Sequence, residues 1–190
     1  MNVCVYCGSR SGMDPAFEEA ARAVGLAIAE RGWSLIYGGG NIGLMGTVAR
    51  TALENGATVT GIIPTFLATK EIALADCTEL IEVESMHIRK ALMIERSDLL
   101  VALPGGFGTL DELFEALTWR QIRLHARPLG LLNVKGYYDP LVAMIDRMRS
   151  DGFVQDRHAS LLHVSDDVNE LFDTLALITT SQFGDHLDLV

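Results

Sequence analysis

Short runs of wholly apolar residues alternate with longer amphipathic segments along almost the whole chain, and this pattern constrains the fold more than any other feature. The expected strands are residues 2–7, 33–37, 57–63, 78–83, 98–104, 128–134 and 161–164. The expected helices are residues 14–32, 44–56, 85–97, 109–125, 138–150 and 166–178. Strands that are apolar throughout belong to parallel sheets buried on both faces. The sequence therefore predicts an α/β fold, a Rossmann-like doubly wound parallel sheet with helices on both faces.

Two features sharpen the expected boundaries. Asp14 and Pro15 stand at the start of the first helix, as a capping residue and a first-turn proline, and Gly32 follows its end. Segment 65–78 shows no clear pattern, and the last ten residues are expected to form an acidic, frayed tail.

Length and composition predict one compact domain spanning residues 1–190, since 49% of the 190 residues are hydrophobic. The net charge of -10 argues against binding nucleic-acid backbones or anionic membranes, so any bound phosphate must be held locally. No apolar run approaches the ~18 residues of a membrane span, and no secretory signal is visible, so we expect a cytoplasmic protein.

Three cysteines are too few, and odd in number, for a disulfide-built fold. Cys4 and Cys7 form a C-x-x-C pair, but both lie in an apolar strand pattern rather than at the start of a helix. Structural thiols are therefore favoured over a redox motif.

Glycine-rich loops follow three of the predicted strands. They are CGSRSG (7–12), YGGGNIG (37–43) and PGGFGT (104–109). Ligands of open α/β sheets bind beyond the carboxyl ends of the strands, where glycines let backbone N–H groups approach closely. The last two loops also precede helices, whose N-termini favour anions. The sequence therefore predicts a phosphate at this edge.

Gly38, Gly40 and Gly43 also satisfy G-x-G-x-x-G, which would indicate bound NAD or FAD in another context. That fingerprint belongs after the first strand and needs an acidic residue about 20 positions later. Here it follows the second strand, and no Asp or Glu occurs between Glu54 and Glu71. A dinucleotide is therefore disfavoured, while a purely structural use of the glycines stays open.

Acidic and basic residues flank the third loop. Thr109 and Glu112 match a capping box, which would make Glu112 a cap of its own helix, but Glu112 and Glu115 also share one helix face. Arg89 and Lys90 either reach solvent from a packed face or approach the same edge of the sheet. A ligand with an anionic end and a centre that develops positive charge, such as a sugar phosphate, would use both kinds of side chain.

These motifs resemble the LONELY GUY (LOG) family of cytokinin riboside 5′-monophosphate phosphoribohydrolases, long described as lysine decarboxylase-like. The family signature P-G-G-x-G-T-x-x-E is met in full at residues 104–112, and M-x-x-R-K is met at residues 86–90. The likeness extends to CGS (7–9), GGGNIGLMG (38–46), GIIPTFL (61–67), TW (118–119) and GLLNVKGYYDPL (130–141). Arg123 departs from the pattern, because the family carries a glycine there.

The resemblance implies hydrolysis of the N-glycosidic bond of a purine nucleoside 5′-monophosphate, either AMP or an N6-modified adenylate, to the free base and ribose 5-phosphate. Arg89 and Glu112 would be the catalytic pair. The substrate-binding residues would be Ser9, Gly39, Gly40, Met86, Lys90, Gly105, Gly106, Gly108, Thr109 and Glu115.

No cofactor or metal is expected. A pyridoxal phosphate decarboxylase would need Lys70, Lys90 or Lys135 as its Schiff-base lysine, and none lies beside a phosphate-type loop. The histidines lack metal-ligand spacing. A nucleotide-binding sensor or carrier without turnover remains an open alternative, since binding needs mainly the glycine loops.

The mean hydropathy of +0.25, at a net charge of -10, indicates more apolar surface than a monomer covers. Together with the resemblance it predicts a homodimer, joined through the exposed faces of helices 85–97 and 109–125.

Overall fold

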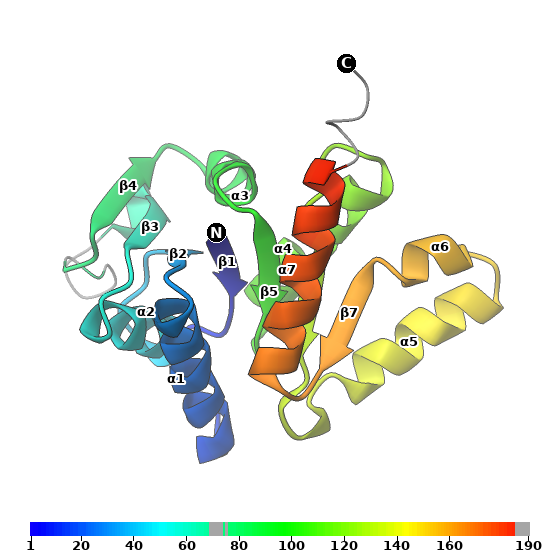
Figure 1. Ribbon diagram of the computed structural model, residues 1–190, viewed down its shortest axis with the longest axis horizontal. Coiled ribbons are helices and arrows are strands. Elements are labelled where there is room, and N and C mark those ends of the chain that lie inside the picture. Colours follow the sequence, from blue (N-terminus) through cyan, green and yellow to red (C-terminus); the bar gives the residue numbers. More distant parts are fainter. Residues whose placement is uncertain (69–73, 75, 185–190) are drawn as a thin grey trace.

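The computed structural model describes residues 1–68, 74 and 76–184, and the strands of this part form one parallel seven-stranded sheet (Figure 1). The strands are β1 (Asn2–Tyr6), β2 (Ser34–Tyr37), β3 (Val59–Pro64), β4 (Glu79–Val83), β5 (Leu99–Ala102), β6 (Leu129–Leu132) and β7 (Leu162–Ser165). Their order across the sheet is β4-β3-β2-β1-β5-β6-β7, and every neighbouring pair is parallel. The predicted fold class is confirmed.

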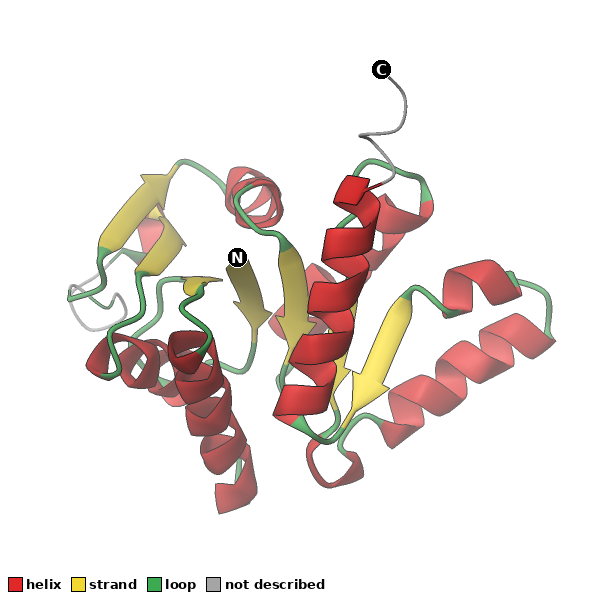
Figure 2. Ribbon diagram, in the orientation of Figure 1, coloured by secondary structure: helices red, strands yellow, loops and turns green. Residues whose placement is uncertain are grey.

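Helices connect the strands and cover both faces of the sheet (Figure 2). They are α1 (Pro15–Glu30), α2 (Gly43–Glu54), α3 (Met86–Glu95), α4 (Phe107–Gln121), α5 (Asp139–Ser150), α6 (Asp156–Ala159) and α7 (Val168–Gly184), with 3-10 turns η1 (Thr65–Leu67) and η2 (Val134–Gly136). One hydrophobic cluster joins α1, α2 and α7 to the sheet, and a second joins α3 and α4 to the other face. Successive strand residues point to opposite faces of the sheet, so Val3 belongs to the first cluster and Cys4 to the second.

Strand β1 lies at the point where the direction of winding reverses. It pairs with β2 on one side and with β5 on the other, so the chain leaves it first toward one edge of the sheet and later toward the opposite edge. At such a switch point the loops after the two central strands diverge and leave a crevice. The fold therefore places the loops after β1 and β5, two of the glycine-rich segments, side by side.

The first predicted helix boundary is confirmed. The Asp14 carboxylate accepts a hydrogen bond from the Ala16 N–H at 2.9 Å, and Pro15 occupies the first turn of α1. Gly32 follows the helix with a φ of +63°, a conformation that favours glycine.

Three expectations are corrected. Helix α4 begins at Phe107 with Gly106 as its N-cap, so Thr109 lies inside the helix and the predicted capping box of Thr109 and Glu112 is wrong. The short helix α6 was not anticipated. Helix α7 continues to Gly184, so the first four of the ten residues expected to form a tail are helical, while residues 185–190 lie outside the described part.

Cys4 and Cys7 are buried and form no disulfide, which agrees with structural thiols. Burial raises the pKa of both thiols well above the ordinary value, and it opposes formation of the reactive thiolate. None of the described helices is long and apolar enough to span a membrane.

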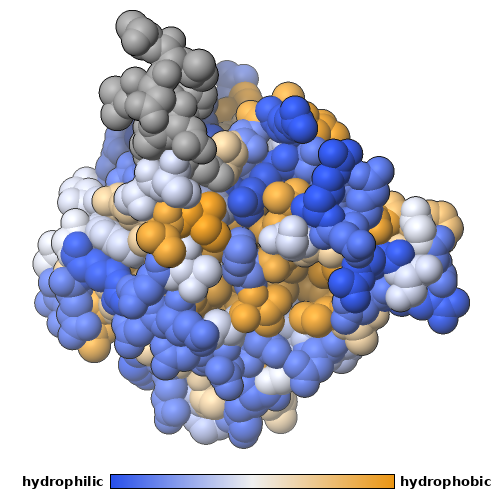
Figure 3. Space-filling model, turned by 45° about the vertical axis from the view of Figure 1, so that its right-hand side comes forward, coloured by the Kyte–Doolittle hydropathy of each residue, from blue (hydrophilic) through white to orange (hydrophobic). Residues whose placement is uncertain are grey.

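The surface nevertheless exposes hydrophobic side chains. Phe107, Phe153 and Leu177 are among the most exposed. The face drawn in Figure 3 shows hydrophobic residues gathered in a central hollow, framed by hydrophilic ones.

Candidate active site

The three glycine loops touch one another at the carboxyl ends of the central strands. The Gly8 N–H donates to the Pro104 carbonyl at 3.1 Å, and the Gly8 carbonyl accepts from the Met45 N–H at 3.3 Å. A Cβ on Gly105 would overlap the Thr109 hydroxyl and lie 2.9 Å from the Gly8 nitrogen. The predicted convergence of the loops is therefore confirmed, and it requires glycine at position 105.

A cavity of about 260 Å³ opens between the loops after β1 and β5. Its lining consists of Gly8, Ser9, Arg10, Ser11, Gly12, Phe17, Leu44, Pro104, Gly105, Gly106 and Tyr137. The Tyr137 hydroxyl donates to the Gly105 carbonyl at 2.7 Å, which fixes one wall of the cavity to the glycine loop. Apart from Arg10, Phe17, Leu44 and Tyr137, the lining consists of glycine, serine and proline residues, which let a ligand approach the backbone closely.

Two of the helices that start at this edge, α2 and α4, lack side-chain caps. Gly106 and Ile42, the N-caps of α4 and α2, make no side-chain hydrogen bond to their helices, whereas Asp14 and Ser85 cap α1 and α3. The first N–H groups of α2 and α4 thus have no side-chain acceptor in the described part of the chain. At α2 the Met45 N–H already donates to the Gly8 carbonyl, so the positive end of α4 is the one that best suits an anion.

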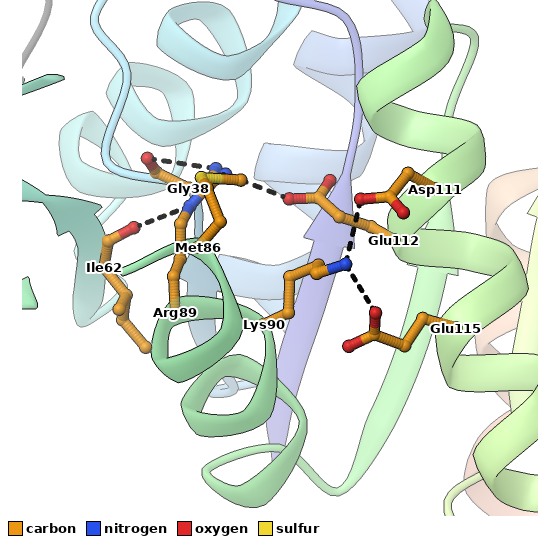
Figure 4. Close-up of polar contacts among 8 residues, drawn as sticks. All are labelled: Gly38, Ile62, Met86, Arg89, Lys90, Asp111, Glu112 and Glu115. Carbon is orange, nitrogen blue, oxygen red and sulfur yellow. Dashed lines mark hydrogen bonds and ion pairs between the residues drawn. The ribbon is translucent and has the colours of Figure 1, made fainter. Parts of the chain in front are cut away.

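Arg89 spans the strand ends from α3 instead of extending into solvent (Figure 4). Its Nε donates to the Ile62 carbonyl at 3.1 Å, and its Nη2 donates to the Gly38 carbonyl at 3.3 Å. A Cβ on Gly38 would overlap the guanidinium, so the glycine makes room for it. The Arg89 Nη1 lies 3.3 Å from the Glu112 Oε1.

Glu112 is held in α4 with only 8% of its surface exposed. Burial raises its pKa to about 6, while the neighbouring Arg89 works in the opposite direction. Desolvation disfavours the charged form, and a nearby cation restores part of the balance. Glu112 is consequently ionised near neutral pH, but in a poorly solvated site where its charge acts strongly on a bound ligand.

Lys90 joins α3 to α4 beside this pair (Figure 4). Its ammonium lies 3.0 Å from the Asp111 carboxylate and also pairs closely with Glu115. Burial lowers the Lys90 pKa, but the hydrogen bonds from Glu115 and Asp111 outweigh it and leave the pKa raised. Lys90 therefore fixes the spacing of the two helices.

Pyridoxal phosphate does not fit the lysines that the structure describes. A Schiff-base lysine must reach its neutral form, and the carboxylates around Lys90 oppose that. Lys135 pairs with Asp14 at 2.6 Å, and this contact raises the pKa of Lys135, which also opposes the neutral form. Lys70 lies outside the described residues.

The structure brings part of the predicted set together. Ser9, Gly105 and Gly106 line the cavity, and Thr109 is buried beneath Gly105. The Met86 sulfur lies 3.8 Å from the Arg89 guanidinium.

Other predicted residues lie apart from the cavity. Gly108 is exposed in the first turn of α4. Gly39 and Gly40 are buried, and a Cβ on either would meet Ile63 or Met45 at 3.0 Å.

Sequence reasoning missed three residues of this region. Arg10 lines the cavity from the first glycine loop, and its place in CGSRSG was the available signal. Tyr137 follows η2; the matching segment 130–141 contains it, but nothing in that segment indicates that its hydroxyl reaches Gly105. Gly38 was noted only as part of a glycine pattern, whereas it accepts the bond from Arg89. In residues 1–68, 74 and 76–184, no cluster of His, Cys, Asp and Glu could hold a metal ion.

Comparison with known proteins agrees with these features. The family model described as "Possible lysine decarboxylase" matches residues 45–175. A probable cytokinin riboside 5′-monophosphate phosphoribohydrolase of Oryza sativa, LOGL1, is 43% identical over 94% of this chain and 80% of its own length. The Arabidopsis thaliana cytokinin riboside 5′-monophosphate phosphoribohydrolase LOG7 is 43% identical over 89% of this chain and 78% of its own.

Solved structures share the fold at low identity. The Moco carrier protein from Chlamydomonas reinhardtii superposes with a TM-score of 0.71 at 23% identity, covering 95% of this chain and 98% of that one. The molybdenum cofactor binding protein from Rippkaea orientalis gives 0.70 at 19% identity, with 93% and 96% covered. Because the family model and the relatives match most of the sequence, the chain belongs to the LOG family of cytokinin riboside 5′-monophosphate phosphoribohydrolases.

Proposed function

We propose that this protein hydrolyses the N-glycosidic bond of a purine nucleoside 5′-monophosphate, AMP or an N6-modified adenylate, to the free base and ribose 5-phosphate. The observation that carries the proposal is the buried Arg89–Glu112 pair, adjoining a glycine-lined edge with two uncapped helix ends. Relatives with 43% identity are named as enzymes of this reaction.

The 5′-phosphate is expected at the glycine edge. Backbone N–H groups at Gly105 and Gly106, together with the open end of α4, favour a dianion there. Arg10 adds a cation at the rim of the same cavity. Holding the phosphate would fix the sugar relative to α4 and reduce the entropy cost of reaching the transition state.

Glu112 is the group suited to the reacting centre. It lies six residues beyond the helix start at Gly106, or about 9 Å along the axis. When the bond to the base breaks, positive charge develops on the sugar ring, and an ionised carboxylate in a poorly solvated site stabilises it. In this scheme, Glu112 also orients the attacking water: the water oxygen bonds to the anomeric carbon as the C–N bond breaks, and the proton that the water loses is balanced by the proton that the departing base nitrogen takes up.

Arg89 has a supporting place in the same scheme. Two backbone carbonyls hold the guanidinium beside Glu112, so it keeps the carboxylate oriented and ionised. Its planar fork also suits hydrogen bonding to the departing base or to ribose hydroxyls. The Lys90 contacts to Asp111 and Glu115 keep α3 and α4, and hence Arg89 and Glu112, at fixed separation.

We further propose that the enzyme works as a homodimer. Phe107 is 95% exposed at the start of α4, and Leu110 and Phe114 line a cavity of about 470 Å³ on the same helix. Ile88 exposes a further apolar surface on the neighbouring α3. A second copy covering this surface would bury it. Free thiols in Cys4, Cys7 and Cys77 are consistent with a cytoplasmic setting.

Substitution of Glu112 tests the chemistry. We expect Glu112→Gln to lower the rate of base release from AMP and from isopentenyladenosine monophosphate by roughly 10²-fold or more, because glutamine keeps the size but removes the charge. Base release is measured by chromatography, and nucleotide binding is measured in parallel by calorimetry. Glu79→Gln, the same change at an exposed ion pair on β4, is the control and should keep its rate.

Two results would contradict the proposal. Base release by Glu112→Gln at the wild-type rate would remove Glu112 from the chemistry. Nucleotide binding without base release by the wild type would identify a sensor or carrier.

The pH dependence follows from the raised pKa of Glu112. We expect kcat/KM to fall as the pH decreases below about 6, because protonation removes the carboxylate charge. Rates are measured from pH 4.5 to 8. The substrate phosphate also titrates near this pH, so residual activity of Glu112→Gln is the control. An inflection that persists unchanged in that variant would belong to the substrate.

The same pKa shift acts on stability with the opposite sign. The pKa of Glu112 is about 6 in the folded chain, against the ordinary value of 4.5 expected in the unfolded chain. The folded chain therefore binds this proton more tightly. Its contribution to the free energy of unfolding is therefore greatest below pH 4.5 and is lost as the pH rises through 6. Urea unfolding of wild type and Glu112→Gln at pH 4.5 and 7 tests this. Between these two pH values the free energy of unfolding should fall more in the wild type than in the variant.

Sedimentation tests the homodimer. At micromolar concentration we expect about twice the chain mass of 20.7 kDa. Phe107→Asp should shift the equilibrium toward the monomer, because it places a charge in the proposed interface. Phe153→Asp, at another exposed phenylalanine, should not. A wild-type monomer under these conditions would refute the assignment.

A further inference from the structure

A second cavity lies at the opposite edge of the sheet, near the amino ends of β6 and β7. Its volume is about 670 Å³, and it lies between the C-terminal end of α4 and the α6–β7 segment. Arg120 on its wall is eight residues beyond Glu112 on the same helix, or about 12 Å along the axis. The cavity is therefore separate from the candidate active site.

The lining of this cavity is cationic in an acidic protein. Arg120, Arg123 and Arg157 line it, and no acidic residue does; His125 and His158 line it too, and burial lowers the pKa of His125 to about 4, so this histidine is neutral at pH 7. Among the described residues, no carboxylate lies within 4 Å of any of the three guanidinium groups. The chain as a whole carries a net charge of -10, so this concentration of unpaired cations is local.

A hydrogen bond holds Arg120 in place, although its charge is partly removed from water. Its Nη1 donates to the Leu161 carbonyl at 2.7 Å, which links α4 to the residue before β7. Burial lowers the pKa of Arg120, since the charge is partly removed from water without a carboxylate to compensate it.

Arg123 occupies a position that favours glycine. It has a φ of +66°, and the bonds from Arg123 N–H to Arg120 O and from Leu124 N–H to Trp119 O form a Schellman motif at the end of α4. A non-glycine residue in this conformation is strained, because its Cβ lies too close to the following carbonyl oxygen. The chain therefore places a cation at the cavity where the backbone alone would favour glycine.

The helix dipole explains only part of this arrangement. Cations near the C-terminus of a helix are stabilised by the dipole, and Arg120 and Arg123 meet that description. Arg157 belongs to α6, a different element, and approaches the same cavity from the other side. Three arginines from two parts of the chain therefore line one cavity, which suits a ligand with several negative charges.

We propose that this cavity binds the diphosphate or triphosphate group of a small molecule. Guanidinium groups match phosphate oxygens with paired hydrogen bonds, and three of them suit two or three linked phosphates better than one carboxylate. The volume falls in the range of small-molecule sites, and exposed Ile122 offers an apolar surface for the rest of such a ligand. The proposal does not depend on the chemistry at Glu112.

Calorimetry with inorganic tripolyphosphate tests the proposal. The wild-type protein is expected to bind one tripolyphosphate per chain, and sulfate at least tenfold more weakly. The double variant Arg123→Gly, Arg157→Gln should bind tripolyphosphate at least tenfold more weakly than wild type. Arg147→Gln, which removes an exposed arginine on α5, should change the affinity less than twofold.

The thermal midpoint of Arg123→Gly shows whether loss of binding could come from misfolding. Arg123→Gly relieves the left-handed backbone strain, so its thermal midpoint should equal or exceed that of the wild type. No binding by wild type would overturn the proposal. Binding that survives in the double variant would also overturn it, because the ion would then occupy another site, such as the glycine edge.

Discussion

The position of β1 at the switch point of the sheet is the constraint on which the candidate site depends. With β2 on one side and β5 on the other, the loops after β1 and β5 are brought together although about 95 residues separate them in sequence. Gly105 allows the contact, since any Cβ there would overlap Thr109. The same topology delivers α3 and α4 to one face, where Arg89 meets Glu112.

This edge of the sheet has two regions that favour ligand groups of opposite charge. The glycine loops and the uncapped start of α4 favour negative charge, whereas buried Glu112 favours a centre that becomes positive. A nucleoside monophosphate presents the first charge permanently and the second only during bond cleavage. Arg89 pairs with Glu112, and Lys90 pairs with Asp111 and Glu115, so these cations reduce the repulsion between the carboxylates and the phosphate.

Much of this arrangement was predictable, because local signals determined it. Apolar runs marked the strands, Asp14 and Gly32 marked the ends of α1, and glycines after three strands marked the ligand edge. The start of α4 was placed two residues late, because the T-x-x-E pattern imitates a cap and the backbone at Gly106 is not readable from residue type. The contacts of Lys90 and the approach of Tyr137 depend on packing between distant elements, which spacing along one helix does not reveal.

A phosphate held at the glycine edge would present the glycosidic bond to Glu112. Comparing adenine release from AMP and from adenosine tests it most directly, because adenosine lacks only the anchoring group. We expect kcat/KM for AMP to exceed that for adenosine by roughly 10³-fold or more, with part of the loss in kcat, since remote binding energy is used to position the reacting centre. Equal kcat/KM values for the two substrates would contradict it.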